Sequence, residues 1–281
     1  MGAEYTELQP DVYRLLLNQL DGREFAPFSS DELEFYNSWD ATEEERRTPL
    51  PHSPKGQVWY NSEGNSEMVS KIRGKLEQNG RLLSDLFHKT RFDSRISFGV
   101  GLPKRQFGDF INWAWMGMTH HFQQKGKGSP AKGINIFFSV HGGYLSTGIS
   151  CYHPEPPVLA GISSRVNKNQ NLILDELDRL RRLGFATYSW EQSEASHNDY
   201  FPEFEIDYRV DEVPLGAHIM KTKLFNLAKI YAAERVLTLG DGILKNVIED
   251  ISQVWCLYML MAGGKVRRYL PLEKLRAKLN E

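Results

Sequence analysis

The sequence predicts an α+β fold, with a mixed or antiparallel sheet packed by helices and a helical extension at the N-terminus. Three observations support this fold class. Strand-like and helix-like segments follow one another without the regular rhythm of a doubly wound sheet. The stretch 95–152 has the pattern of a β-α-β-β unit, and the segment 243–261 is apolar on more than one face, which is typical of a helix buried in a core.

The N-terminal part of the chain predicts helices separated by a loop. Apolar residues recur at helical spacing over 9–20 and end at Asp21-Gly22. A shorter helix follows over 29–39, because Ser29-Ser30-Asp31-Glu32 has the pattern of an N-cap with acids in the first turn. Residues 40–58 are charged and then proline-rich, so we expect a surface loop there.

The next segments lead into the centre of the chain. Residues 66–87 have helical spacing, interrupted by Asn79-Gly80, where we expect a break or kink because glycine weakens a helix interior. A short strand then leads to Gly99-Val100-Gly101, interpreted as a tight turn, and the aromatic segment 107–122 is helix-like. Strands are expected at 133–140 and 144–150, joined by a hairpin turn at His141-Gly142-Gly143, since glycine supplies the positive φ that such turns need.

The remaining segments alternate in type. The sequence predicts a proline-rich turn at 153–158, a helix at 169–183 capped by Gly184, strands at 185–190 and 204–210, a strand or loop at 217–227, and a helix at 243–261 ended by Gly263-Gly264. We divide the chain into an acidic helical extension with a proline-rich loop (1–60), an α+β domain (61–262) and a basic C-terminal tail or linker (263–281).

Cysteine usage and hydropathy favour a cytoplasmic location. The two cysteines, Cys151 and Cys256, are far apart and stand among apolar residues, so we expect buried structural thiols. No run approaches the roughly 20 apolar residues of a membrane span. The N-terminus carries acids where a signal peptide would carry Lys or Arg.

Charge is distributed unevenly along a chain whose net charge is −2. Residues 88–135 contain eight Lys/Arg and two Asp/Glu, or 8 − 2 = +6, whereas residues 1–80 contain eight Lys/Arg and fifteen Asp/Glu, or 8 − 15 = −7. The cations most relevant to binding are Lys104, Arg105, Lys125, Lys127 and Lys132. A local cationic surface of this kind suits a phosphate backbone.

The chemical motifs of enzymes are incomplete in this sequence. Gly99-Val100-Gly101 lacks the third glycine of a dinucleotide fingerprint, and no phosphate-binding loop motif is present. His120-His121 has no companion ligands for zinc, and Glu205/Asp207 lacks the lysine that would complete a metal-dependent nuclease motif. We therefore expect no catalysis, no metal and no cofactor.

Aromatic residues stand close in sequence to the cations. Trp113, Trp115 and Tyr144 are candidates for stacking on bases, because phosphates take the positive charge while bases stack on rings. The alternative for any one of these tryptophans is a place in the core.

From Ile96-Ser97-Phe98-Gly99-Val100-Gly101 onward, the chain resembles the N-terminal DNA-binding domain of McrB, the GTP-dependent subunit of modification-dependent restriction systems. The shared elements are a strand ending S-F-G-x-G, the segment Asn112-Trp113-Ala114-Trp115, a strand beginning Gly133-Ile134 and another ending at Ser150. Later, Gly216 to Lys221 and the helix 243–261 are similar to that family's closing motif and final helix. The resemblance covers about residues 91–262.

The resemblance implies a DNA-binding module of a defence system. Such a domain binds duplex DNA carrying a modified base, expected to be a methylated cytosine, and flips that base into an aromatic pocket. Val100 would stand at the wedge that enters the duplex, where a large aromatic would be expected, and Trp113, Trp115 and Tyr144 would line the base pocket. GTPase and nuclease activities would belong to other domains or subunits.

A second resemblance leads to a different function. The stretch 125–159 is also similar to an uncharacterised bacterial α+β family with a G-K-x-S-P…G…P-E-P-x-x-L pattern. The alternatives to DNA binding are therefore a hydrolase, or a protein-interaction module without nucleic acid.

Overall fold

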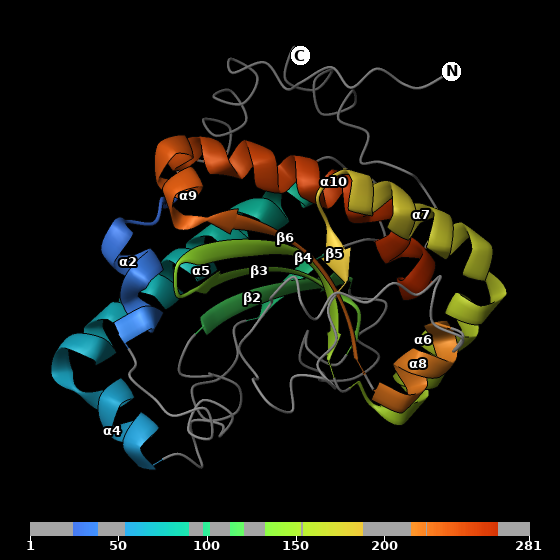
Figure 1. The fold of residues 1–281 in the computed structure, drawn as a ribbon, viewed down its shortest axis with the longest axis horizontal. Helices are drawn as coiled ribbons and strands as arrows, with labels where there is room; N and C mark the ends of the chain where they lie inside the picture. Colours follow the sequence, from blue (N-terminus) through green and yellow to red (C-terminus); the bar gives the residue numbers. More distant parts are fainter. Residues whose placement is uncertain are drawn as a thin grey trace.

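The computed structural model describes residues 25–38, 54–89, 98–101, 113–120, 133–152, 154–187, 215–222 and 224–263. They form an α+β fold in which helices pack on a six-stranded sheet (Figure 1). Every pair of neighbouring strands is antiparallel. The predicted fold class is confirmed.

The sheet is built around a meander of its first four strands. In chain order the strands are β1 (Phe98–Gly101), β2 (Trp113–His120), β3 (Asn135–His141), β4 (Tyr144–Tyr152), β5 (Ala186–Thr187) and β6 (Leu224–Ala232). Their order in the sheet is β1-β2-β3-β4-β6-β5, so β6 lies between β4 and the edge strand β5.

The helices surround this sheet. They are α2 (Ser30–Glu34), the 3-10 helix η1 (Phe35–Ser38), α4 (Pro54–Asn61), α5 (Glu63–Lys89), α6 (Pro156–Lys168), α7 (Gln170–Arg182), α8 (Leu215–Thr222), α9 (Ala233–Leu239), the 3-10 turn η7 (Gly240–Gly242) and α10 (Ile243–Ala262).

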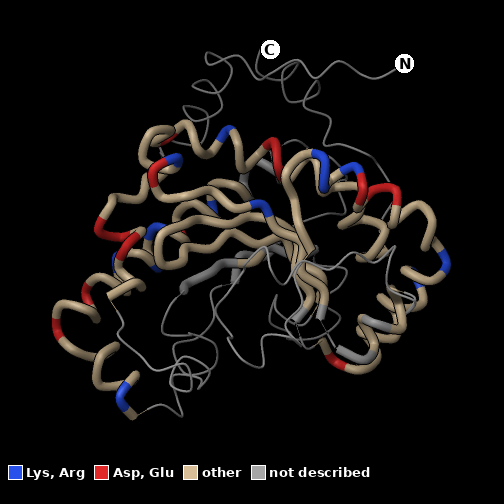
Figure 2. The backbone as a smooth tube through the Cα atoms, in the orientation of Figure 1, with Lys and Arg blue, Asp and Glu red and all other residues tan. Residues whose placement is uncertain are grey.

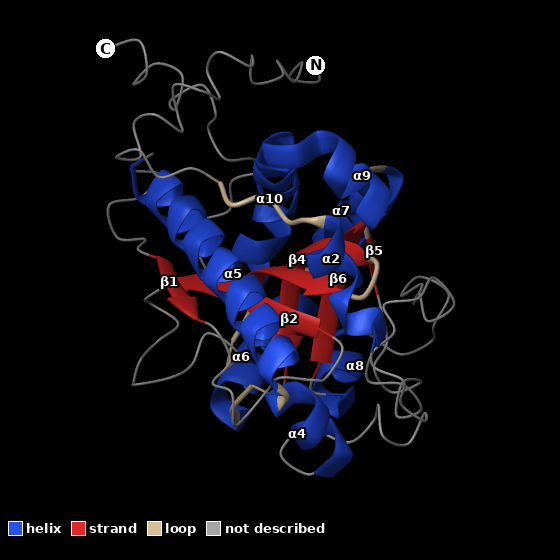
Figure 3. Cartoon of the chain, turned by 90° about the vertical axis from the view of Figure 1, so that its left-hand side faces the viewer, coloured by secondary structure: helices blue, strands red, loops and turns tan. Residues whose placement is uncertain are grey.

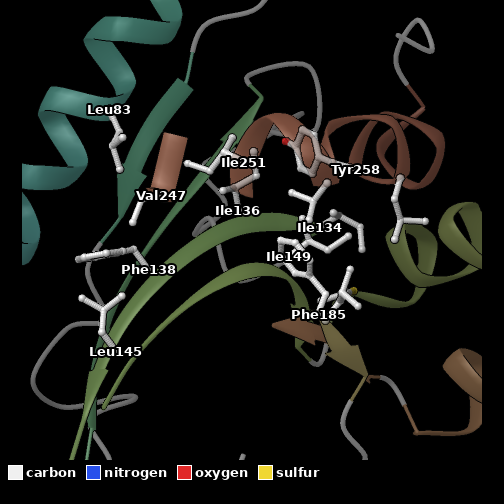
Figure 4. Close-up of a cluster of buried hydrophobic side chains, with 14 of the residues drawn as sticks. Leu83, Ile134, Ile136, Phe138, Leu145, Ile149, Phe185, Val247, Ile251 and Tyr258 are labelled. Atoms are coloured by element: carbon white, nitrogen blue, oxygen red, sulfur yellow. The ribbon is translucent and has the colours of Figure 1, made fainter. Parts of the chain in front are cut away.

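One face of the sheet, here called the helix face, packs against α5 and α10. Helix α5 contacts β1, β2 and β3, and α10 contacts β3 and β4 (Figure 3). The main core forms between them (Figure 4) and includes Ile136, Phe138, Leu145 and Ile149 from the strands and Leu83, Val247, Ile251 and Tyr258 from the helices. Burial of these side chains is the main stabilising contribution to the fold.

The expectation of a helix over 107–122 is wrong for residues 113–120, which form strand β2. Its register on β3 pairs Trp113 with His141 and Met116 with Phe138. Gly99 and Gly101 likewise belong to strand β1 instead of a turn. The apolar run 113–118 lacks polar alternation, and periodicity alone cannot separate such a run from a buried helix.

The hairpin between β3 and β4 is confirmed, and its turn lies against the N-terminal segment. Gly143 has φ 85°, which glycine adopts readily, and its N–H donates to the carbonyl of Leu33 at 2.8 Å. A Cβ on Gly142 would lie 2.2 Å from Oδ1 of Asn37. Gly143 is therefore required by its backbone conformation, and Gly142 by the close approach of η1.

Residues 25–38 share the core of the sheet. The short helix predicted at Ser29 is confirmed as α2 and η1, with a capping box in which Ser29 N–H donates to the Glu32 carboxylate at 2.7 Å. Phe28 lies with its ring centre 6.0 Å from that of Phe138. The N-terminal segment thus packs directly on β3.

Helix α5 runs without a break through Asn79-Gly80, so the predicted break in the helix is wrong. Asn79 is fully buried, and its amide pairs with the backbone of Ala26: Oδ1 accepts from the N–H at 2.7 Å and Nδ2 donates to the carbonyl at 3.0 Å. Tertiary contacts of this kind override the low helix propensity of Asn and Gly.

Other differences concern short helices. Residues 54–58 begin α4 instead of lying in a loop, and residues 217–222 are helical in α8, before β6. Helices α6 and α9 are absent from the prediction. For α6, the prolines in 153–158 indicate only a turn, whereas Pro156 occupies the first turn of the helix.

The long helices predicted near the C-terminus are confirmed. Helix α7 ends before Gly184, with φ 86°, and α10 ends before Gly263, with φ 85°. Strand β5 confirms the first part of the strand expected at 185–190. The predicted helix 9–20, the strand 204–210 and the tail 264–281 lie outside the described residues.

Candidate functional site

The sheet is almost free of charge. The six described strands contain a single charged residue, Lys229 in β6. Figure 2 shows the acidic and basic residues of the described segments mainly on the helices. Apart from Lys229, the described strands therefore offer a ligand neutral hydrogen-bonding groups and rings.

The second face of the sheet carries buried polar residues, and we call it the polar face. Because side chains alternate along a strand and directly opposite residues share a face, the register assigns alternate positions of β3, β4 and β6 to it. The polar face includes Asn135, Ser139, His141, Ser146, Ser150 and Asn226, together with Phe137, Tyr144, Gly148, Ala228, Ile230 and Ala232. All seven residues of β3 are buried, so both faces of this strand are covered.

A hydrogen-bonded cluster occupies one end of the polar face. Oγ of Ser139 lies 2.7 Å from Oγ of Ser146 and 2.9 Å from Nε2 of His141, and Ser146 Oγ lies 3.3 Å from the same nitrogen. The His141 ring stacks on the ring of Tyr144, with centres 4.4 Å apart and planes 9° from parallel. The cluster joins β3 to β4 at the hairpin end.

Burial keeps His141 neutral. The side chain is 2% exposed, and desolvation lowers its pKa to about 3. A serine hydroxyl within reach of a histidine nitrogen is the geometry of a nucleophile and its base. Here the ring is a weak base, both hydroxyls are buried, and the described strands offer no carboxylate to orient it. The arrangement suits hydrogen bonding to a neutral partner better than nucleophilic attack.

The other end of the polar face carries asparagines. Asn135 pairs with Ser150, and Ser150 pairs with Asn226, so these three residues form a row across β3, β4 and β6. Between this row and the cluster lie Phe137 and Ala228, which form a small apolar patch with Tyr144 packed against it. The polar face thus has two hydrogen-bonding ends and an apolar middle.

The register brings the predicted base-pocket residues to one end of this face. Trp113 is paired with His141, which is paired with Tyr144, and Trp115 is paired with Ser139. Three strands therefore place the predicted aromatic positions next to the hydroxyl–imidazole cluster. One side of the Tyr144 ring is occupied by His141.

The remaining predicted site residues are placed apart or not described. Val100 lies in β1, paired with Met118 of β2 on the same sheet face as Ile136 and Phe138. Val100 therefore lies on the opposite face of the sheet from Trp113 and Trp115. Lys104, Arg105, Lys125, Lys127 and Lys132 lie outside the described residues, as do Glu205 and Asp207.

Sequence reasoning missed the polar face itself. His141 was interpreted as a turn residue, but it ends β3 with a buried side chain. A signal was present, because Asn135, Ser139 and His141 alternate with Ile136, Phe138 and Val140. Asn226 had no such signal, since the segment 217–227 was ambiguous.

The cysteines agree with the prediction. Cys151 and Cys256 are free and buried, and desolvation raises the pKa of the Cys151 thiol to about 12. In the described ranges, no three His, Cys, Asp or Glu side chains gather closely enough to hold a metal ion. Of the helices that the structure describes, none is both long and apolar enough to cross a bilayer.

No protein-family model matches the chain, and no curated protein matches it significantly.

Proposed function

We propose that this chain is a DNA-binding specificity module that recognises a modified base, expected to be a methylated cytosine, in duplex DNA. The base leaves the helix and is received at the polar face. The observation that supports this is the register that brings Trp113, Trp115 and Tyr144 beside the buried Ser139–His141–Ser146 cluster.

The chemistry of this face matches a nucleobase. A base offers a flat ring that stacks on aromatic side chains, at roughly 1–3 kcal/mol for each stacked base. Its edge offers neutral donors and acceptors, which hydroxyls and a neutral imidazole can satisfy. A charged metabolite would instead need counter-charges, and the described strands contain only Lys229.

Contacts to the DNA backbone are assigned to the cationic segment. Lys104, Arg105, Lys125, Lys127 and Lys132 belong to the stretch whose formal charge is 8 − 2 = +6. Phosphate contacts of this kind position a protein on the duplex without reading sequence. Recognition of the modified base would then depend on the sheet.

The same proposal assigns no catalysis and no cofactor to this chain. In the McrB-like arrangement, a GTPase domain or nuclease subunit carries out hydrolysis and cleavage, in defence against foreign DNA, and the chain acts in the cytoplasm. The competing function is a hydrolase, for which the specific support is the Ser139–His141 contact of 2.9 Å.

A gel-shift panel tests the proposal. The full chain is mixed with otherwise identical duplexes that are unmodified or carry 5-methylcytosine, 5-hydroxymethylcytosine or N6-methyladenine. We expect at least ten-fold tighter binding to one modified duplex. Equal binding across the panel, or none, would overturn the proposal. Release of product from ester substrates, abolished in Ser139→Ala, would support the hydrolase instead.

A further inference from the structure

The buried amide of Asn226 lacks the hydrogen bonds that its position demands. The side chain is 0% exposed, and neither Oδ1 nor Nδ2 has a hydrogen-bond partner among the residues that the structure describes. On β3, the buried Oδ1 of Asn135 likewise has no hydrogen-bond partner among the described residues. Orphaned buried polar groups are rare in native proteins, and each calls for an explanation.

Structural need does not explain this amide. Asn79 is also 0% exposed, but both ends of its amide pair with the backbone of Ala26. Asn226 stands between the buried apolar residues Phe225 and Leu227, where an apolar side chain would avoid the cost of desolvating an unpaired amide. Asn79 and Asn226 are thus equally buried, but only the Asn79 amide is paired within the described residues.

The register places the Asn226 amide and the unpaired Oδ1 of Asn135 in one row. Asn135 and Asn226 flank Ser150 on neighbouring strands, which are spaced about 4.8 Å apart, so their Cα atoms are about 10 Å from one another. The adjoining positions on the same face are Phe137, Gly148 and Ala228, which form an apolar surface whose central position, Gly148, carries no side chain. A planar group lying on this surface would meet the amides with its edge.

We propose that Asn135, Ser150 and Asn226 form a hydrogen-bonding row for the edge of a planar, uncharged ligand that offers a donor beside an acceptor. This inference rests on the proposed function, under which the ligand is the flipped cytosine. Nδ2 of Asn226 donates to the ring nitrogen N3, and Oδ1 accepts from the exocyclic N4 amino group. The row therefore supplies recognition of the base edge.

Paired leucine substitutions test the row. In the full chain, Asn226→Leu is compared with Asn79→Leu by thermal unfolding, with and without 5-methyl-2′-deoxycytidine, and by the gel-shift panel. The free nucleoside is expected to raise the melting temperature of the wild-type chain. Asn226→Leu should melt no lower than wild type without nucleoside, should lose the nucleoside-dependent rise, and should bind the preferred duplex at least ten-fold more weakly.

The control should behave in the opposite way. Asn79→Leu leaves the backbone N–H and carbonyl of Ala26 without their hydrogen-bond partners. The melting temperature of this variant should fall by about 4 °C or more, with the nucleoside-dependent rise retained. Asn226→Ala, which adds no bulk, repeats the test if leucine does not fit. A fall for Asn226→Leu and Asn226→Ala as large as that of Asn79→Leu would show a structural amide and overturn the row.

The outcomes separate the row from the proposed function. Binding of Asn226→Leu to the preferred duplex with wild-type affinity would overturn the row and leave the function standing. If the wild-type chain shows no duplex preference, but the nucleoside raises its melting temperature and Asn226→Leu abolishes that rise, the row is supported and the proposed function is overturned. Absence of both effects in the wild-type chain would overturn both.

Discussion

Lys229 in β6 and Asp250 in α10 form a largely buried ion pair, with Nζ 3.0 Å from Oδ1. Tyr231, two residues along β6, donates its hydroxyl to the other carboxylate oxygen. The ammonium group also lies 5.5 Å from the centre of the Phe185 ring. The single charge of the described strands is therefore neutralised on the helix face, where it joins the sheet to α10.

Asp250→Ala should destabilise the protein by roughly 2–3 kcal/mol. This is below the range for a fully buried pair, because the Lys229 side chain keeps 29% of its exposure. Urea unfolding at pH 7 measures the change. Lys245→Ala is the control, because its ion pair with Glu249 is long, at 4.0 Å, and partly exposed, so the expected change is about 0–0.5 kcal/mol. Equal effects of the two substitutions would contradict a structural role for the Lys229–Asp250 pair.

His141 should make the fold sensitive to mild acid. Burial lowers its pKa to about 3, whereas the unfolded chain protonates histidine near pH 6.5, so the unfolded state binds more protons between these values. The stability that depends on neutral His141 is present above about pH 6.5 and is lost as the pH falls toward about 3. The slope should reach about 1.4 kcal/mol per pH unit.

Substitution of His141 isolates this contribution. His141→Gln keeps a polar side chain near Ser139 and Ser146 but cannot be protonated. Between pH 6.5 and pH 5, the free energy of unfolding of wild type should fall by about 2 kcal/mol more than that of the variant. Urea titrations at both pH values give the four free energies. Parallel pH dependence in the two proteins would mean that His141 is not the responsible group.

Gly148 should tolerate no side chain. A Cβ there would lie 1.9 Å from the carbonyl oxygen of Leu227, which belongs to the backbone of β6 and cannot move without disturbing the β4–β6 pairing. Gly148→Ala should cost about 3 kcal/mol or more. Gly74 is the matched control, because it lies on an exposed part of α5 where a Cβ would meet no atom within 4 Å. Gly74→Ala should stabilise the protein by about 0.5–1 kcal/mol. Thermal unfolding compares the two, and a neutral Gly148→Ala would contradict the close approach of β4 and β6.

Phosphate contacts and base contacts should respond differently to substitution. Under the proposed function, changing Lys125 and Lys127 to Ala should weaken binding to modified and unmodified duplex alike and reduce the salt dependence by a slope of about one for each phosphate that is no longer neutralised. Trp113→Ala or Trp115→Ala should erase the preference for the modified duplex, at roughly 1–3 kcal/mol.

Folding must be separated from binding in the tryptophan variants. Loss of a core tryptophan would cost roughly 3–5 kcal/mol of stability, which a melting curve detects. A variant that melts like wild type and has lost only the preference supports stacking on the base. Lysine variants that change the preference, but not the salt slope, would contradict the division of roles.

The strand β2 shows why part of the fold could not be predicted. Its sequence from Trp113 to Met118 is apolar at consecutive positions, so it lacks the alternation of polar and apolar residues that marks a half-buried strand. Periodicity alone does not separate such a run from a buried helix. In the same way, α5 continues through Asn79 because of its pairing with Ala26, which lies 53 residues away in sequence.

The sequence by itself determined the features that depend on neighbouring residues: the α+β class, the helix N-cap at Ser29, the β3–β4 hairpin with its glycines, and helices α7 and α10 with Gly184 and Gly263 after their ends. These follow from backbone conformation and from apolar spacing within one turn or strand. Only the tertiary structure decided that Asn135, Ser150 and Asn226 share a row and that His141 is buried beside Ser139 and Ser146. Register between strands up to about 90 positions apart is set by the packing of both sheet faces, and no local pattern in the sequence records it.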